Sequence, residues 1–187
     1  MRLNKHFLRD NTPHAFLSAS NHAWVRYDDD KLIEKLMTAK ATDRGTKLHK
    51  MAAMMIEEEI RAEDIPQTFN MYVNDCIGHR MSPEVILMVN EFAFGTADAL
   101  SWRDNYLRIF DLKTGLGHTS MEQLLVYAAF FCLEYMQNPF EIKIELRIYQ
   151  NNEIRIEMAD PGDVYHIMAK VTWATKLITK VMEEEQS

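Results

Sequence analysis

The sequence predicts one α/β domain over residues 1–187, built on a central mixed β-sheet flanked by helices. Three observations support this class: a helical first third, three consecutive apolar strands after it, and a long helix that separates those strands from two more. Hydrophobic residues make up 47% of the chain and charged residues 26%, which is the balance of a globular protein with a sizeable core.

Several helices are expected in the first third. A short helical element is predicted at 18–26, and a helix at 29–38. A stronger helix should begin at Asp43, which suits a helix N-cap, because apolar residues recur at helical spacing over 48–55. Another helix is predicted at 66–76, since proline is favoured in a first helical turn.

The following segment is rich in β-branched and aromatic residues, which favours strands. We expect three antiparallel strands at 85–94, 95–102 and 106–113, with a hairpin turn at 103–105. A long buried helix is then predicted at 120–137, because this stretch has no glycine or proline.

The last part of the chain alternates apolar and polar residues, which is the pattern of a strand with one buried face. Strands are predicted at 142–149 and 154–158, joined by a turn at Asn151 and Asn152. A final helix should start after Asp160 and reach about residue 183.

The composition excludes several classes of protein. No stretch approaches the roughly 18 apolar residues of a membrane span, and the N-terminus has no secretory pattern, so a cytoplasmic protein is expected. The two cysteines, Cys76 and Cys132, lie far apart and predict neither a disulfide framework nor a zinc site. A net charge of −7 opposes non-specific attraction to nucleic acid, so DNA binding would need a local basic groove or bound cations.

The chemistry-bearing residues gather around the expected hairpin. Asp98 lies on its first strand and Asp111 near the end of its second, so antiparallel pairing brings the two carboxylates together. Adjacent carboxylates repel unless a cation joins them, and oxygen ligands suit Mg²⁺ or Mn²⁺. Lys113 shares a strand face with Asp111 and can position a water or a phosphate. The alternative is that Asp111 and Lys113 form a surface ion pair and Asp98 belongs to a turn.

Five short motifs occur in a fixed order along residues 17–135. They are Ser18-Ala-Ser20 followed by Trp24, Gly45-Thr46-x-x-His49, Gly95-x-x-Asp98, Asp111-x-Lys113, and Gln123-x-x-x-Tyr127. In this order they resemble the RecB-like branch of the PD-(D/E)XK nuclease superfamily, which includes CRISPR-associated exonucleases and many phage recombination nucleases. The resemblance implies a restriction-endonuclease-like core and one nuclease domain.

The resemblance also implies roles for these residues. Mg²⁺ or Mn²⁺ would be held by His49, Asp98, Asp111 and the carbonyl of Leu112. The catalytic residues would be Asp98, Asp111, Lys113, Gln123 and Tyr127. The DNA contacts would come from Ser18, Ser20, Gln123 and Tyr127, and the basic side chain of Lys47 is a further candidate for DNA binding because of its charge. Residue chemistry adds Glu91 as a further candidate ligand, and Lys50, Arg103 and Arg108 as candidate phosphate contacts.

The chain departs from the family in one respect that bears on cofactors. Many RecB-like nucleases carry four cysteines around an iron–sulfur cluster, whereas two cysteines cannot hold one. The expected function is divalent-metal-dependent hydrolysis of DNA, as an exonuclease acting on DNA ends in phage-type recombination or repair, in a bacterial or phage-infected cell. The alternative is a nuclease subunit or a catalytically silent DNA-binding relative that depends on a helicase or a single-strand annealing protein.

Overall fold

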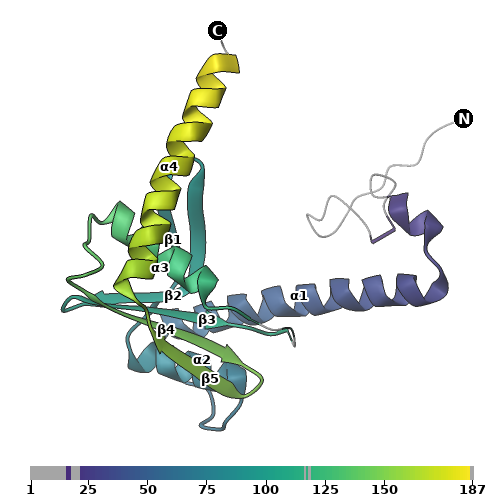
Figure 1. Ribbon diagram of the computed structural model, residues 1–187. Helices are drawn as coiled ribbons and strands as arrows, with labels where there is room; N and C mark the ends of the chain where they lie inside the picture. Colours follow the sequence, from purple (N-terminus) through teal and green to yellow (C-terminus); the bar gives the residue numbers. More distant parts are fainter. Residues whose placement is uncertain (1–15, 18–21, 116, 118, 186–187) are drawn as a thin grey trace, which may run out of the picture. The chain divides into compact units, whose positions relative to one another are not determined.

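The computed structural model describes residues 16–17, 22–115, 117 and 119–185 (Figure 1). By its internal contacts the chain divides into two compact units, with their boundary between Thr46 and Lys47. The single nuclease domain expected from the sequence stays a prediction. Among the residues of the first unit whose burial is described, only Gly45 is buried. Within the described part of the chain, no helix is both long and apolar enough to cross a membrane.

The first helices differ from the prediction. A 3-10 helix, η1, spans His22–Arg26, and a single helix, α1, runs from Asp29 to Glu57. Asp43 therefore lies inside α1 and does not begin a new helix. The hydroxyls of Thr38, Thr42 and Thr46 each donate to the carbonyl four residues earlier, so these polar side chains are accommodated without a break.

The second unit contains a five-stranded mixed sheet, as predicted, with strand order β1-β2-β3-β4-β5. The strands are β1 Ser82–Asn90, β2 Ala93–Arg103, β3 Tyr106–Leu112, β4 Lys143–Gln150 and β5 Glu153–Met158. All neighbouring pairs are antiparallel except β3 and β4, which are parallel because the helix α3 crosses over between them.

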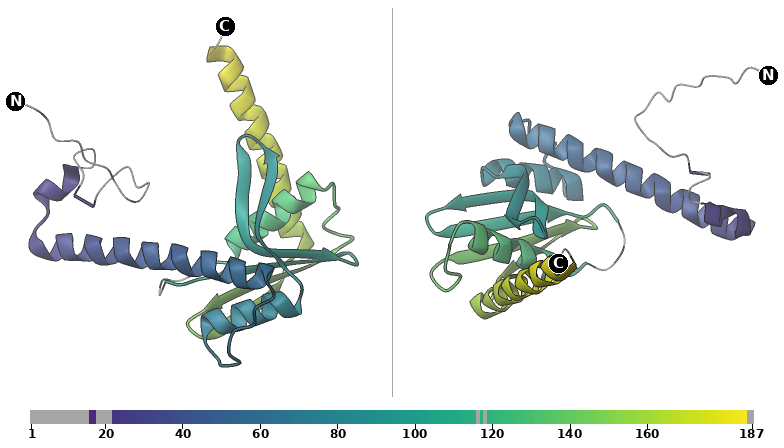
Figure 2. Two further views of the ribbon diagram at one scale, coloured as in Figure 1. Left: turned by 180° about the vertical axis from the view of Figure 1, so that it is seen from behind. Right: turned by 90° about the horizontal axis from the view of Figure 1, so that it is seen from above.

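Helices cover both faces of this sheet (Figures 1 and 2). Helix α3 (Glu122–Glu134) packs on one face together with the first half of α4 (Pro161–Glu185). Helix α2 (Thr68–Gly78) and the end of α1 pack on the other face. Ile109 and Phe110 are neighbours on β3 and point into these two separate cores.

The hairpin turns explain where the sequence prediction succeeded. Asp104 and Asn105 have φ values of 52° and 55°, and Asn151 and Asn152 have 52° and 61°. Two successive residues of positive φ are the requirement of a tight antiparallel hairpin, and aspartate and asparagine tolerate it well. Both turns lie where the sequence placed them.

The turn between β1 and β2 was misplaced. The sequence put the boundary after residue 94, but Asn90 pairs with Ala93, so the turn lies at Glu91 and Phe92. At this turn the Asn90 side chain donates to Thr175 on α4. The exposed edge of β1 is partly covered as well, because the Met88 amide donates to the Glu134 carboxylate at 2.7 Å.

Candidate metal centre

Asp98 lies where β2 separates from β3. Residues three apart on a regular strand point to opposite faces of the sheet, yet Ala97 and Leu100 both pack in the core beneath α3. The alternation of side chains along β2 is therefore interrupted between them. Pairing with β3 begins only at Ala99, opposite Phe110. At Asp98, where the backbone pairing of β2 with β3 has not yet begun, a side-chain contact joins the two strands: Asp98 Oδ2 accepts a 2.8 Å hydrogen bond from the Leu112 amide.

His49 reaches this carboxylate from the last turns of α1. Its Nδ1 lies 3.3 Å from Asp98 Oδ2. The pKa of His49 is raised, chiefly by its hydrogen bond to Asp98, although partial burial acts in the opposite direction. The predicted proximity of His49 and Asp98 is thus present in the structure.

Asp111 is buried, with 3% of its surface exposed. Its Oδ2 lies 3.1 Å from Lys113 Nζ, but within the described chain no donor makes a hydrogen bond of good geometry to this oxygen. Burial, and next the charge of Asp98, raise the pKa of Asp111 to about 6. The charge of Asp98 therefore opposes the ionisation of Asp111.

Lys113 begins a chain of polar contacts that ends on α3. Its Nζ donates to Gln123 Oε1 at 2.9 Å, and Gln123 Nε2 donates to the Tyr127 hydroxyl at 3.2 Å. The Tyr127 ring lies over Gly95: a Cβ at this position would stand 3.0 Å from Tyr127 Cε1. The absence of a side chain at Gly95 therefore allows the Tyr127 ring to pack against the backbone of β2.

Glu84 is a site residue that the sequence did not reveal. Pro83 pairs with Ala99 and Val85 with Ala97, which places Glu84 opposite Asp98. One ligand atom from each of Glu84, Asp98 and His49 lies within 4.8 Å of the others. Glu84 also has a φ of 49° inside a strand, which costs a non-glycine residue about 1 kcal/mol.

Glu91, the additional ligand suggested by the sequence, is in the wrong place. It lies exposed in the β1–β2 turn. The strand from Ala93 to Asp98 alone spans about 16 Å at the usual rise per residue. The error follows from the misplaced turn: with the turn at Glu91 and Phe92, and with the register shift between Met88 and Asn90, Glu84 comes to lie opposite Asp98.

The donor set fits a divalent cation. Glu84 and Asp98 supply carboxylate oxygens and His49 an imidazole nitrogen, a mixture suited to Mn²⁺ or Mg²⁺. Asp111 is not one of these three grouped residues, but its carboxylate lies close enough to feel the charge of Asp98, and its Oδ2 contacts the Lys113 ammonium. A cation at the group would relieve the repulsion between the carboxylates.

Replacing His49 with asparagine is expected to weaken Mn²⁺ binding about tenfold, because one ligand of the set is removed. Titration calorimetry measures this directly. His166→Asn is the matched control, since His166 lies exposed on α4. Equal Mn²⁺ affinity in His49→Asn and the unmodified chain would leave His49 with a packing role alone.

The other residues predicted from the sequence are placed as follows. Ser18 and Ser20 lie outside the described residues. Lys47 and Lys50 are exposed on α1. The Leu112 side chain is buried in the core beneath α2, and only its amide is seen to contact Asp98.

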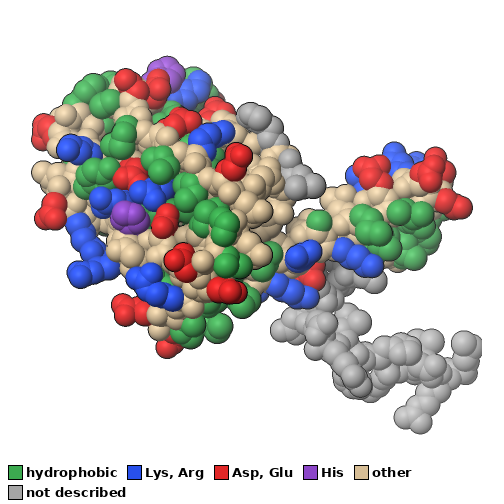
Figure 3. Space-filling view, turned by 90° about the horizontal axis from the view of Figure 1, so that it is seen from below, with side chains coloured by type: hydrophobic (Ala, Val, Ile, Leu, Met, Phe, Trp, Pro, Cys, Tyr) green, Lys and Arg blue, Asp and Glu red, His purple; other side chains and the backbone are tan. Residues whose placement is uncertain are grey.

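Arg103 and Arg108 are engaged elsewhere. Arg103 donates to the carbonyl of Arg80. Arg108 lies over the Tyr106 ring and 3.6 Å from Glu145. On the face seen in Figure 3, basic and acidic side chains are intermixed and no broad basic surface stands out.

A recess of about 530 Å³ opens beside Lys113. Its lining residues are Lys113, Thr119, Ser120, Glu122, Gln123 and Val126. The recess offers hydroxyl, amide and ammonium groups next to the metal-ligand cluster, which are suitable contacts for a phosphate or a sugar.

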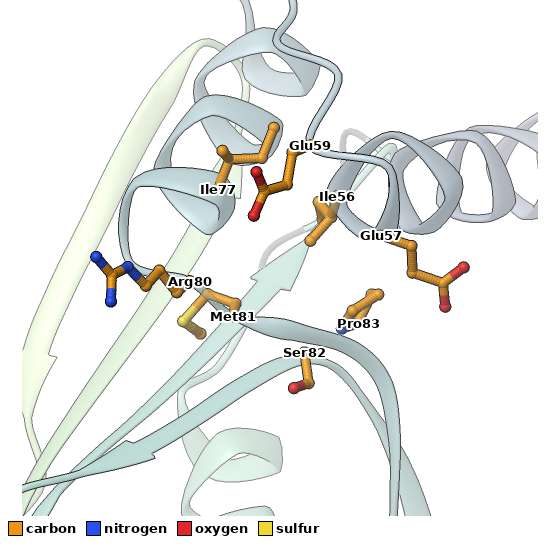
Figure 4. Close-up of a pocket in the computed structure, with 8 residues that line it drawn as sticks. All are labelled: Ile56, Glu57, Glu59, Ile77, Arg80, Met81, Ser82 and Pro83. Atoms are coloured by element: carbon orange, nitrogen blue, oxygen red, sulfur yellow. The ribbon is translucent and has the colours of Figure 1, made fainter.

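A second pocket, of about 460 Å³, lies at the start of β1. Figure 4 shows its lining residues: Ile56, Glu57, Glu59, Ile77, Arg80, Met81, Ser82 and Pro83. The Glu59 carboxylate points toward Ile77 while Arg80 extends away from it, so the charged groups do not converge on one ligand position. None of the residues predicted for chemistry lines this pocket.

In comparisons with known proteins, no protein-family model, no curated protein and no solved structure matches the chain.

Proposed function

We propose that this chain is a divalent-metal-dependent DNA nuclease of the PD-(D/E)XK type. One observation carries the proposal: the buried Asp111 carboxylate lies 3.1 Å from the Lys113 ammonium and within electrostatic range of a second carboxylate, Asp98. A structural ion pair would not need a second carboxylate, whereas phosphodiester hydrolysis uses both a cation site and a nearby ammonium.

The residues would have separate roles in binding the metal and in hydrolysis. Asp98, Asp111, His49 and Glu84 would hold Mg²⁺ or Mn²⁺. When bound, such a cation stabilises charge on phosphate oxygens and makes water a better nucleophile. Lys113 Nζ stands next to this set, where it can donate to a water or a phosphate oxygen. Gln123 and Tyr127 hold the ammonium at its position.

The acidic charge of the chain bears on how it would approach DNA. A net charge of −7 repels a polyanion, and the arginines nearest the hairpin already have partners. Divalent cations at the carboxylate cluster would remove part of this repulsion. DNA binding should therefore require the cation itself.

The finer proposal is an exonuclease that acts on DNA ends in phage-type recombination or repair. It rests on the order of the five motifs along the chain. A helicase or an annealing protein would be a partner in that setting.

The direct test is cleavage of labelled linear and circular DNA by the purified chain in Mg²⁺, Mn²⁺, Ca²⁺ and EDTA. We expect cleavage of linear DNA in Mg²⁺ or Mn²⁺ and none in EDTA. Ca²⁺ should support DNA binding with little cleavage, because its looser coordination positions water poorly. Binding in EDTA as tight as in Ca²⁺, or cleavage in EDTA, would contradict the proposal.

A further inference from the structure

The β1–β2 hairpin has two different faces. Its inner face packs beneath α3 through Leu87 and Ala97, which are both fully buried. Its outer face carries three apolar side chains in the open: Ile86 is 62% exposed, Met88 51% and Phe94 58%. In the left view of Figure 2 the hairpin stands in front of α3 and α4, so its outer face is turned away from both helices.

The three exposed side chains form one patch. Met88 is directly opposite Phe94 in the register, and Ile86 lies two residues along β1, on the same face as Met88. Side chains directly opposite in an antiparallel pair are close neighbours. We call Ile86, Met88 and Phe94 the hairpin patch.

The hairpin patch leads directly from the metal centre. Glu84 is two residues before Ile86 on β1, and Asp98 is four residues after Phe94 on β2. At the usual rise per residue, Phe94 lies about 13 Å from Asp98 along the strand.

The charges around the hairpin patch decide what can occupy it. Residues 81–102 contain no lysine or arginine, while Glu84, Glu91 and Asp98 are acidic. Such a surface cannot hold a phosphate backbone by charge. Flat apolar rings without charge are the complementary ligand, and the exposed faces of nucleobases have this character.

We propose that the hairpin patch binds the bases of unpaired nucleotides in the strand that leads to the metal centre, with Phe94 as the stacking ring. The inference rests on the proposed nuclease function and adds a ligand class to it. Within a duplex, stacking on the neighbouring base pairs covers the faces of the bases, so unpaired nucleotides are the ones that offer a ring to Phe94.

The test compares Phe94→Ser with Phe94→Tyr, which retains a stacking ring, and with Phe140→Ser. Phe140 is the matched control, because it is 62% exposed and lies before β4, outside the hairpin. Fluorescence anisotropy in Ca²⁺ measures the affinity for a labelled oligothymidylate and for a blunt duplex of equal length. Thermal melting and Mn²⁺ calorimetry check the fold and the metal centre of each variant.

We expect Phe94→Ser to weaken oligothymidylate binding about tenfold, since stacking on an aromatic ring contributes about 1–3 kcal/mol per base. The slope of affinity against salt should stay unchanged, because no phosphate contact is lost. Phe94→Tyr and Phe140→Ser should bind like the unmodified chain, and duplex binding should change little in all variants.

Two results would overturn the assignment of the patch alone. One is that Phe94→Ser binds the oligothymidylate as tightly as the parent chain does, while the parent chain cleaves DNA. The other is a parent chain that sediments as a dimer and becomes a monomer in Phe94→Ser, which would make the patch a contact between copies. A parent chain that binds Mn²⁺ but neither binds nor cleaves any DNA would overturn the nuclease proposal and the patch together.

Discussion

Asp111→Asn is expected to reduce DNA cleavage by about a thousandfold or more while making the metal-free fold more stable. The loss follows because a bound cation contributes several kcal/mol to the transition state, and each 1.36 kcal/mol corresponds to about tenfold in rate. The gain in stability follows because the amide removes a buried charge whose pKa is raised by burial and by Asp98.

Two measurements on metal-free protein and one on activity test this prediction. Chemical denaturation in EDTA at neutral pH should show Asp111→Asn more stable than the parent chain, by about 1 kcal/mol or more. Mn²⁺ calorimetry should show weakened binding. Glu157→Gln is the control, since Glu157 is exposed on β5 and pairs only with Arg155 among the contacts described. Full cleavage by a folded Asp111→Asn variant would contradict the proposed role of this carboxylate.

Lys113→Met is expected to slow cleavage by about a hundredfold to ten-thousandfold with Mn²⁺ binding retained. An ammonium positioned to donate a proton or a hydrogen bond in the transition state contributes on this scale. Methionine keeps much of the side-chain length and removes the charge, so the contact with Asp111 and the bond to Gln123 are both lost. Gln123→Leu should cost less, about tenfold, because it removes only the group that holds Lys113 in place.

Lys143→Met provides the matched control for this series, because Lys143 is exposed at the start of β4. Single-turnover cleavage rates separate the chemical step from DNA binding. Equal single-turnover rates for Lys113→Met and Lys143→Met would show that the ammonium at position 113 does not serve the reaction.

Much of the fold was predictable because it is encoded by local patterns. The helix α3 and the strands β4 and β5 follow from apolar spacing alone. The turn at Asp104 and Asn105 sets the register of β2 with β3, which is why Asp98 and Asp111 could be paired on paper. The two carboxylates and Lys113 could therefore be predicted from residue chemistry and strand pairing alone.

The rest depended on contacts that local patterns do not encode. Asp43 has the chemistry of a helix cap, yet α1 continues through it, because capping preference is weak against an uninterrupted helix. Glu84 became visible only with the correct β1–β2 register. The network in which Arg147 and Tyr149 both contact Asp75 joins residues more than seventy positions apart, and no short motif marks it.

The cover over the edge of β1 has a consequence for solubility. An edge strand with open backbone amides and apolar side chains is a template for strand addition between molecules, and β1 carries Ile86 and Met88 on such an edge. The Glu134 carboxylate accepts a hydrogen bond from the Met88 amide and adds a negative charge at this edge. The positive φ of Glu84 and the register shift between Met88 and Asn90 make the edge irregular. These features disfavour amyloid-like pairing of β1 with other copies of the chain, while the side chains proposed to bind nucleobases stay exposed on its face.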